Sequence, residues 1–165
     1  MPWEVQVAHV EFSLSDSFGQ PLRRASTVDA ATEGESCPLG PGLQRWSGVV
    51  AGAQEPCLVI DVDGRIVAAS QSCHDLLGMG DPADTPGQYL LDGVRHLVDF
   101  TAARNGLPEA DIDAIPPLLA LTSGRQTRGL LRVHDGDYDV TVDGIAVPLR
   151  EGDEVVGSLT FFSAI

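Results

Sequence analysis

The stretch CLVIDVDGRIVAASQSCHDLLG, residues 57–78, contains the signals that decide the fold of this chain. Its first six residues are almost all apolar or β-branched, and residues 65–70 are similar, so two strands are favoured. Between them lies Asp63-Gly64, which is typical of a tight hairpin turn because glycine accepts a positive φ angle without steric cost. Residues 71–78 then predict a short helix, with Ser70 or Ser72 as its N-cap and Gly78 as the residue that ends it. The stretch therefore predicts a β-hairpin followed by a helix.

Downstream of this stretch, apolar side chains recur first at helical and then at strand spacing. One apolar stripe predicts a helix over 89–105, and another predicts a helix over 109–123, which Pro116-Pro117 is expected to kink or restart. The remaining residues favour three strands joined by tight turns, over 126–134, 138–149 and 154–164. The last of these is nearly all apolar, as a central strand would be. The order predicts an α+β domain: a five-stranded antiparallel sheet, with helices inserted between the second and third strands and packed on one face.

An N-terminal extension precedes this domain. Residues 3–14 alternate apolar and polar side chains, which favours a strand, and residues 15–41 are rich in Ser, Gly, Pro, Thr and Ala, which is typical of a flexible linker. Residues 42–54 place apolar side chains three and four positions apart, which predicts an amphipathic helix. The chain thus divides into a strand and linker over 1–41, a leading helix over 42–54 and a folded domain over 55–165.

The chain is strongly acidic. Its 165 residues include 24 Asp and Glu against 10 basic residues, all of them Arg, for a net charge of −14. Such a surface repels phosphate polyanions and anionic lipids, so we expect neither nucleic-acid binding nor membrane-surface binding. The sequence contains no run of 18 apolar residues, so no membrane-spanning helix is predicted. Cys37, Cys57 and Cys73 are odd in number and lack CxxC spacing, which favours reduced thiols and a cytoplasmic location.

The sequence contains none of the common catalytic motifs GxSxG, HExxH, GxxxxGK(S/T) or a strand-following GxGxxG. We therefore predict no catalytic residue and expect that the chain is not an enzyme. Asp135, Asp137 and Asp139 have the spacing that opens a calcium loop, but Val140 and Ala146 stand where such a loop needs Gly and Glu. We interpret this acidic cluster as a hairpin turn and predict no metal site.

Two segments of the chain resemble the PAS domain family. In residues 57–78, an apolar strand leads through Asp-x-x-Gly-x-Ile into a second strand and then into a short helix that ends Leu-Leu-Gly. VDGIAVPLREGDEVVGSL, residues 142–159, is similar to the final hairpin of the family, with Pro-Leu before the turn and Val-Gly opening the last strand. Ser70 stands where the family most often has Asn, and it can cap the helix as well. The resemblance covers residues 55–165, and the Asn-Cys-Arg-Phe-Leu-Gln helix of the flavin-binding branch does not occur.

The resemblance implies a five-stranded sensory or interaction module, often dimeric through a helix before its first strand, for which residues 42–54 are the candidate. We expect a non-catalytic signalling module that senses a small apolar ligand or binds a regulatory protein partner, and that forms a homodimer. Large apolar residues outside the domain core are the expected interface anchors: Trp3, Trp46, Val49 and Val50. The N-terminal strand is a candidate to cross to a second subunit and extend its sheet edge.

A small ligand would bind between the sheet and the helices. The helix stripes and the inward sheet positions supply the expected lining of that pocket: Ile60, Leu91, Val94, Val98, Ile115, Leu119, Leu130, Ile145 and Phe161. The alternative left open is that these side chains close a solid core without a ligand, since apolar stripes are most often core.

The remaining alternatives depend on cysteine and histidine. A thiol redox sensor would use Cys57 or Cys73, and the latter lies near a helix N-terminus that is expected to lower its pKa. A haem-binding PAS sensor would use His96 or His74 as the axial ligand, although the helical wheel turns His96 toward solvent. Adjacent helical side chains point about 100° apart, so a buried Cys73 predicts an exposed His74. The least favoured alternative is a small α+β enzyme that pairs His74 or His134 with an Asp. No cofactor is required by the sequence.

Overall fold

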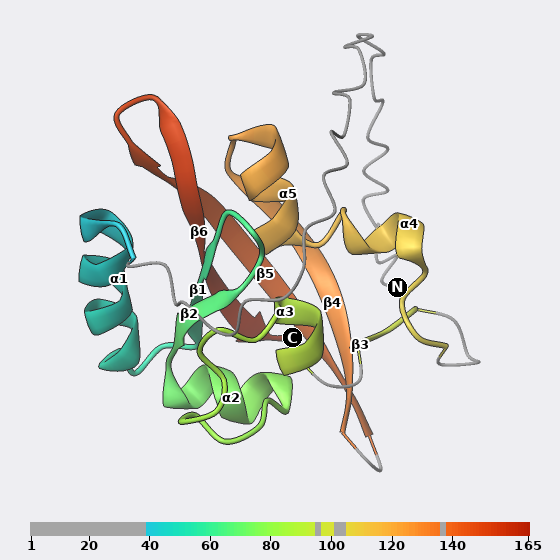
Figure 1. Ribbon diagram of the computed structural model, residues 1–165. Coiled ribbons are helices and arrows are strands. Elements are labelled where there is room, and N and C mark those ends of the chain that lie inside the picture. Colours follow the sequence, from blue (N-terminus) through green and yellow to red (C-terminus); the bar gives the residue numbers. More distant parts are fainter. Residues whose placement is uncertain (1–38, 95–96, 101–104, 136–137) are drawn as a thin grey trace, which may run out of the picture. The chain divides into compact units, whose positions relative to one another are not determined.

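The computed structural model describes residues 39–94, 97–100, 105–135 and 138–165 (Figure 1). Every element described below belongs to one compact unit, which begins at residue 37. The predicted strand over 3–14 and the predicted linker, apart from residues 39–41, lie outside the described residues.

Six antiparallel strands form one sheet in the order β2-β1-β6-β5-β4-β3. Five of them are the predicted strands: β1 (Cys57–Asp61), β2 (Ile66–Ala69), β4 (Thr127–Asp135), β5 (Tyr138–Glu151) and β6 (Glu154–Ala164). The sixth strand, β3 (Leu97–Val98), forms the sheet edge next to β4. The predicted α+β class is confirmed, with the inserted helices between β2 and β4. Strand β6 lies between β1 and β5, the central place that its apolar run predicts.

The hairpin and helix of residues 57–78 form as their sequence predicts. Gly64 closes the β1–β2 turn with φ 76°. Ser70 caps helix α2 (Gln71–Leu77) by accepting a hydrogen bond from the Cys73 N–H over 3.2 Å, and Gly78 ends the helix with φ 59°. The Ser70 hydroxyl also accepts from the Cys57 N–H and donates to the Glu55 carbonyl. One hydroxyl therefore joins the start of α2 to the start of β1.

The predicted helix over 89–105 is wrong beyond its first turn. Among the described residues of this segment, only α3 (Leu90–Gly93) is helical; Val94 is extended, with φ −88° and ψ 95°, and β3 pairs with β4. The edge of β4 offers unpaired backbone groups, and the β-branched residues Val94 and Val98 suit an extended chain. Tertiary pairing therefore overrides the helical spacing of the apolar residues.

The second predicted helix, over 109–123, is divided by its prolines. Helix α4 (Glu109–Ile112) ends before them, and α5 (Pro116–Ser123) begins at the first of them. Neither Pro116 nor Pro117 has an N–H that could continue the hydrogen bonds of α4, so the predicted restart is confirmed. None of the helices in the described part of the chain is long and apolar enough to cross a membrane.

Each face of the sheet has its own apolar cluster. Helices α2, α3 and α5 cover one face, and the buried residues there, here called the inner core, are Leu58, Ile60, Ile66, Cys73, Leu77, Met79, Leu90, Val94, Ile115, Leu131, Val133, Val142 and Phe162. Helix α1 (Pro41–Ala51) packs on the opposite face, where the buried residues, here called the α1 cluster, are Leu43, Val50, Cys57, Val59, Ala68, Leu149 and Leu159. Strand β1 contributes alternate residues to both clusters, as a strand covered on two faces does.

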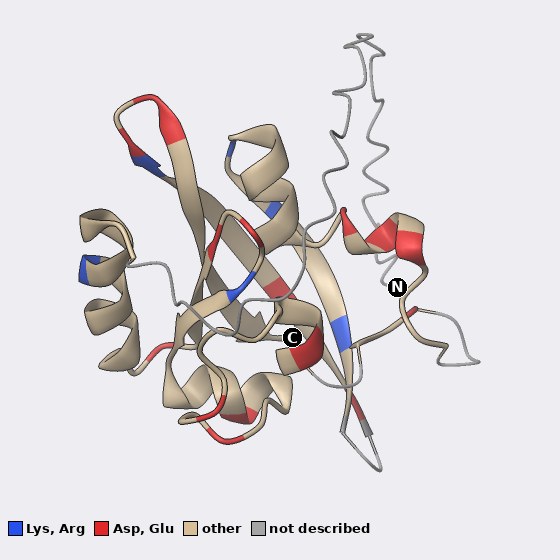
Figure 2. Ribbon diagram, in the orientation of Figure 1, with Lys and Arg blue, Asp and Glu red and all other residues tan. Residues whose placement is uncertain are grey.

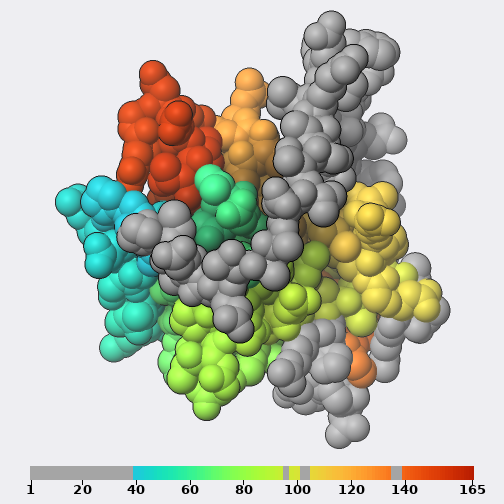
Figure 3. All heavy atoms as spheres, in the orientation of Figure 1, coloured from blue at the N-terminus to red at the C-terminus, as the bar shows by residue number. Residues whose placement is uncertain are grey.

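The start of α1 is tied to the β5–β6 hairpin. The Gly42 N–H donates a hydrogen bond to Glu151 Oε1 over 2.7 Å, and the helix and the hairpin are neighbours in the space-filling view (Figure 3). The predicted leading helix over 42–54 therefore forms, with bounds shifted toward the N-terminus, and it packs on the sheet face away from the other helices.

A β-bulge shapes the edge strand β2. Ile60 pairs with Ile66 and Val59 pairs with Ala68, which leaves Val67 without a partner on β1. The extra residue turns Ala68 toward α1, while Ile66 stays in the inner core. The bulged end of β2 consequently borders the space between α1 and α2.

Candidate functional site

Three of the predicted pocket residues lie between the sheet and the helices that cover it. Ile60, Val94 and Ile115 belong to the inner core, and they come from β1 and from the residues that flank α3 and α5. These positions are those at which a small molecule between the sheet and the helices would be contacted. Val98 is buried too, but it pairs with Arg132 between the inward Leu131 and Val133, so its side chain points to the opposite face and its inward placement is wrong.

Three other predicted pocket residues of the sheet also point to the opposite face. Leu130, Ile145 and Phe161 are 51, 37 and 47% exposed, so their inward placement is wrong. Side chains alternate along a strand, and it is the neighbours Leu131 and Phe162 that belong to the inner core. These strands carry apolar residues on both faces, so the sequence does not reveal which set points inward.

The helical pocket residues Leu91 and Leu119 also lie at the surface, 38 and 37% exposed. Helix α3 is a single turn that buries Leu90 instead, and α5 buries Ala120 together with its two prolines. The prediction for Leu91 failed because it assumed a long helix whose stripe would run through that position.

The inner face of β6 carries a buried polar residue that no sequence pattern predicts. Thr160 is fully buried, and its Oγ1 has no hydrogen-bond partner among the described residues. It lies two residues from Phe162 of the inner core and two from Ser158, whose hydroxyl donates to the Pro117 carbonyl of α5. A threonine in an apolar strand gives no signal in a sequence that its hydroxyl is unpaired.

Leu130, Ile145 and Phe161 form an exposed apolar surface, here called the open sheet face. Ile145 pairs directly with Phe161 across β5 and β6, and Leu130 stands opposite Asp143 across β4 and β5. Helix α1 packs on the same side of the sheet, over residues of β1, β2, β5 and β6. The open sheet face is therefore the part of this side that α1 leaves uncovered.

The charged residues on the open sheet face form internal pairs. The Arg128 guanidinium contacts both carboxylate oxygens of Asp143, at 2.6 to 3.0 Å, and hydrogen bonding to Arg128 holds the pKa of Asp143 below its usual value. Asp139 lies 2.7 Å from Arg132 Nη2 and 2.8 Å from His134 Nδ1. The two Arg and the two Asp of these pairs thus balance each other among the described side chains of this face, whereas acidic residues gather at hairpin turns and on the helices elsewhere (Figure 2).

The pairing of His134 with Asp139 is the arrangement that the enzyme alternative would need. Arg132 holds the same carboxylate, however, and the pair lies on an open strand face that supports no enclosed substrate. In the part of the chain that the structure describes, no group of three or more His, Cys, Asp or Glu side chains is placed to hold a metal ion.

The predicted interface residues of α1 divide between surface and core. Trp46 and Val49 are 37 and 57% exposed, but Val50 is buried in the α1 cluster, so its prediction as an interface residue is wrong. A helix that packs on a sheet must bury one side, and Leu43 and Val50, two turns apart, are that side. Trp3 lies outside the described residues.

Cys73 and His74 are both buried, so the expected exposure of His74 is wrong. Cys73 packs in the inner core, where burial raises the pKa of its thiol to about 12, opposite to the expected lowering. Burial raises the pKa of Cys57 as well. Desolvation outweighs the weak field of a short helix, which removes the premise of a reactive thiol. His74 is covered by the loop that follows α2, where its Nδ1 lies 3.0 Å from the Gly80 carbonyl oxygen. His96 lies outside the described residues.

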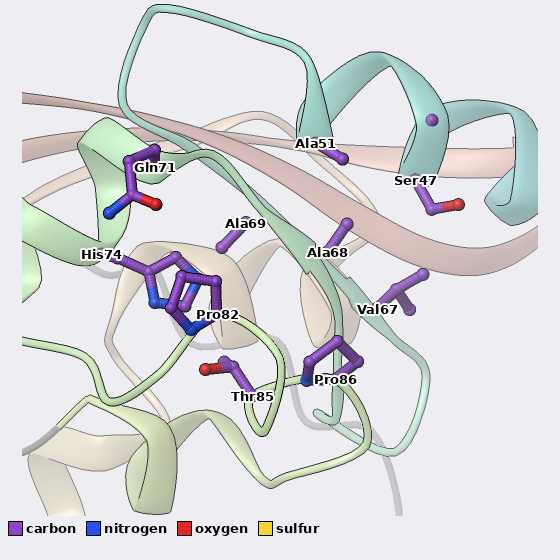
Figure 4. Close-up of a pocket in the computed structure, with 11 residues that line it drawn as sticks. Ser47, Ala51, Val67, Ala68, Ala69, Gln71, His74, Pro82, Thr85 and Pro86 are labelled. Carbon is purple, nitrogen blue, oxygen red and sulfur yellow. The ribbon is translucent and has the colours of Figure 1, made fainter.

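A groove of about 400 Å³ lies between α1, β2, α2 and the loop over residues 79–88 (Figure 4). Its lining comes from all four segments: Ser47, Gly48, Ala51, Val67, Ala68, Ala69, Gln71, His74, Pro82, Thr85 and Pro86. No pattern in the sequence predicts this groove. The signal that could have found it is the set of small side chains on α1 and β2, which leave space where larger residues would close the contact.

The architecture is similar to that of several solved structures. One is the PAS domain of a protein from Colwellia psychrerythraea, with 18% identity and a TM-score of 0.50 over 74% of this chain and 96% of that chain. A second is the Rhodobacter sphaeroides LOV protein, with 17% identity and a TM-score of 0.55 over 76% of this chain and 68% of that chain. A third is a variant of Vivid, with 14% identity and a TM-score of 0.54 over 81% of this chain and 100% of that chain. No family model matches the chain, and no curated protein matches it.

Proposed function

Because this chain has the fold of PAS domains, we propose that it is a non-catalytic signalling module that works as a homodimer through its open sheet face. The observation that carries this proposal is the exposure of Leu130, Ile145 and Phe161 on three neighbouring strands beside α1. Adjacent large apolar side chains on a sheet face are typical of a contact surface, because water solvates them poorly.

Residues of α1 extend this surface. Trp46 and Val49 are exposed on the helix that packs on the same side of the sheet. Aromatic side chains such as those of Trp46 and Phe161 bury a large area with few rotatable bonds, which makes them favourable anchors of an interface. The expected contact therefore combines the helix and the three strands.

The distribution of charge favours a second copy of this chain as the partner that covers the open sheet face. Two chains of net charge −14 repel each other over most of their surfaces. The open sheet face is the exception, because Arg128 and Arg132 balance Asp143 and Asp139 there. A two-fold interface brings one face against the same face, so a neutral apolar surface is what such an interface needs. A regulatory protein partner that used this face would compete with the second copy.

A small apolar ligand with one polar group is the signal that we propose for the inner core. Thr160 supports it, since its buried hydroxyl has no partner among the described residues. Leaving such a group unpaired costs about 1–3 kcal/mol, and a hydrogen bond from a ligand would remove that cost. The expected ligand therefore contacts Thr160 together with Ile60, Val94 and Ile115.

Strand β1 is the proposed route from the ligand to the dimer. Its residues Leu58 and Ile60 lie in the inner core, and Cys57 and Val59 lie in the α1 cluster. A ligand that favours one position of β1 therefore also favours one position of α1, which borders the proposed interface. A ligand shifts the equilibrium between two positions of β1 only by the difference between its affinities for them.

The homodimer is tested by measuring molar mass with light scattering coupled to size exclusion. We expect about twice the 17.4 kDa of the single chain, and we expect Phe161→Glu to give the single-chain mass, because it would bury one carboxylate from each copy in an apolar interface. Val62→Glu is the matched control, since Val62 is 58% exposed in the β1–β2 turn, and it should keep the dimer. A monomeric wild-type chain, or a dimeric Phe161→Glu variant, would overturn the proposal.

A further inference from the structure

The groove beside β2 has the size and the walls of a small-molecule site. Its volume of about 400 Å³ falls in the range of roughly 300–1,000 Å³ that is usual for ligand pockets. Val67, Ala68, Pro82 and Pro86 give it apolar walls. Gly48 of α1 keeps it open, because a Cβ added there would meet no atom within 4 Å.

His74 presents a hydrogen-bond acceptor to this groove. It is only 4% exposed, and its Nδ1 lies 3.0 Å from the Gly80 carbonyl oxygen. A carbonyl can only accept, so Nδ1 carries a proton, and in the tautomer with this single ring proton Nε2 keeps its lone pair. Among the described residues, the hydrogen bond found for this ring is the one at Nδ1, and Nε2 is not one of the buried atoms that lack a partner, which agrees with its opening toward the groove. A buried ring held by one nitrogen thus has its other nitrogen free for a ligand.

The hydroxyl groups that line the groove donate their hydrogen atoms to backbone carbonyl groups, as Nδ1 of His74 does. Thr85 is 2% exposed and donates to the Asp81 carbonyl over 2.8 Å. Ser47 donates to the Gln44 carbonyl over 2.8 Å. Both oxygens retain lone pairs but have no hydrogen left to donate. The imidazole and both hydroxyl groups in the lining therefore accept hydrogen bonds, and a ligand that binds to them must donate. Gln71, whose Nε2 donates to Asp75 Oδ1 over 3.0 Å, is the lining side chain that also carries a donor.

Charge around the groove favours a cation. Asp75 of α2 and Asp81 and Asp84 of the covering loop are exposed and close to His74 in the sequence, although none of them lines the groove, and the chain as a whole has a net charge of −14. The guanidinium of Arg65, which lies beside the end of this loop, donates hydrogen bonds to the Gly87 carbonyl over 2.8 Å and to the Tyr89 hydroxyl over 2.9 Å. The carboxylates thus add an attraction for positive charge to the demand for a donor.

We propose that this groove binds a small organic ammonium ion, whose N–H groups donate to His74 Nε2 and whose short apolar body lies against Val67, Ala68 and Pro86. The site is separate from the inner core and from the open sheet face, so it does not depend on either being occupied.

Three probes of equal size test the proposal on the full chain: benzylammonium, benzyl alcohol and benzoate. Titration followed by two-dimensional ¹H–¹⁵N NMR should show saturable shifts at Gly48, Ala69 and His74 with benzylammonium. Benzyl alcohol should bind more weakly, because it donates once and has no charge, and benzoate should not bind. Equal binding of all three, preference for benzoate, or no saturable binding of benzylammonium would overturn the proposal.

Two variants locate the binding. Gly48→Leu should abolish benzylammonium binding by filling the groove, and Gly52→Leu is its control at the C-cap of the same helix, a position outside the lining where a Cβ meets only ordinary contacts. His74→Asn keeps a donor for the Gly80 carbonyl but removes Nε2, so it should weaken binding about tenfold, the value of one hydrogen bond. Unchanged affinity in Gly48→Leu would place the ligand elsewhere and overturn the proposal, and unchanged affinity in His74→Asn would overturn the role of His74.

Discussion

Gly157 of β6 lies directly against Leu43 of α1. A Cβ added to Gly157 would stand 2.7 Å from Leu43 Cδ2 and would overlap the carbonyl oxygen of Ile60. The missing side chain therefore lets β6 approach β1 and lets α1 settle on both. This contact gives a physical reason for the Val-Gly pair that opens the last strand.

Gly157→Ala should destabilise the protein by about 1–3 kcal/mol, the usual effect of inserting a methyl group into a packed site. Gly48→Ala is the matched substitution, because its Cβ has open space, and it should stabilise α1 by up to about 1 kcal/mol through helix propensity. Urea unfolding of both variants measures the free energies. A neutral Gly157→Ala variant would contradict the close approach of β6 to β1 and α1.

Thr160→Val should raise the stability of the ligand-free protein by about 1–3 kcal/mol, because valine has nearly the same shape and removes an unpaired buried hydroxyl. Thermal or urea unfolding measures the change, with Thr127→Val as the control, since the Thr127 hydroxyl donates to the Pro116 carbonyl and its loss should destabilise. A destabilised Thr160→Val variant would mean that the hydroxyl has a partner in the folded chain.

The buried thiols should resist alkylation. Cys57 and Cys73 are 1 and 0% exposed, and burial raises the pKa of Cys73 to about 12, so almost no thiolate is present near neutral pH. In a Cys37→Ser background, iodoacetamide at pH 8 should leave the native chain unmodified and should add two groups after unfolding in urea. Mass spectrometry counts the additions. Rapid modification of the native chain would restore the redox alternative.

Asp143 should make stability depend on pH in the acid range. Its pKa is lowered in the folded state by the hydrogen bond from Arg128, so the folded chain favours the carboxylate. The resulting stabilisation is present above the usual carboxyl value of 3.8 and is lost as the pH falls through the lower folded value. Urea unfolding between pH 6 and pH 2 should show a smaller acid-induced loss for Asp143→Asn than for wild type, whereas Asp113→Asn should follow wild type. Parallel curves for Asp143→Asn and wild type would contradict the pairing.

Local signals predicted much of this fold. The Asp63-Gly64 turn, the Ser70 cap, the Gly78 stop and the restart at Pro116-Pro117 all form as predicted. Each is decided by the conformational limits of one or two residues, which distant contacts rarely override. The central place of β6 was predictable for a related reason, since a strand that is apolar on both faces must be covered on both.

The side-chain directions in the sheet were not predictable in the same way. Leu130, Ile145 and Phe161 are as apolar as the inward Leu131 and Phe162, and composition does not distinguish a core face from a contact face. Val50 was misplaced for the converse reason, because a residue of a leading helix was expected at an interface and instead seats that helix on the sheet. The groove depends on the β2 bulge and on a loop that folds back over His74, and neither leaves a periodic pattern.

The central claim is that two copies meet through the open sheet face, and a cross-link at its centre tests it most directly. In a Cys37→Ser background, Ile145→Cys places one accessible thiol among Leu130 and Phe161, while Cys57 and Cys73 stay buried. Mild oxidation should join two Ile145→Cys chains into a species of about twice 17.4 kDa, whereas Val62→Cys, in the exposed β1–β2 turn, should remain a single chain. Absence of the linked species for Ile145→Cys, or equal linking of both variants, would contradict the claim.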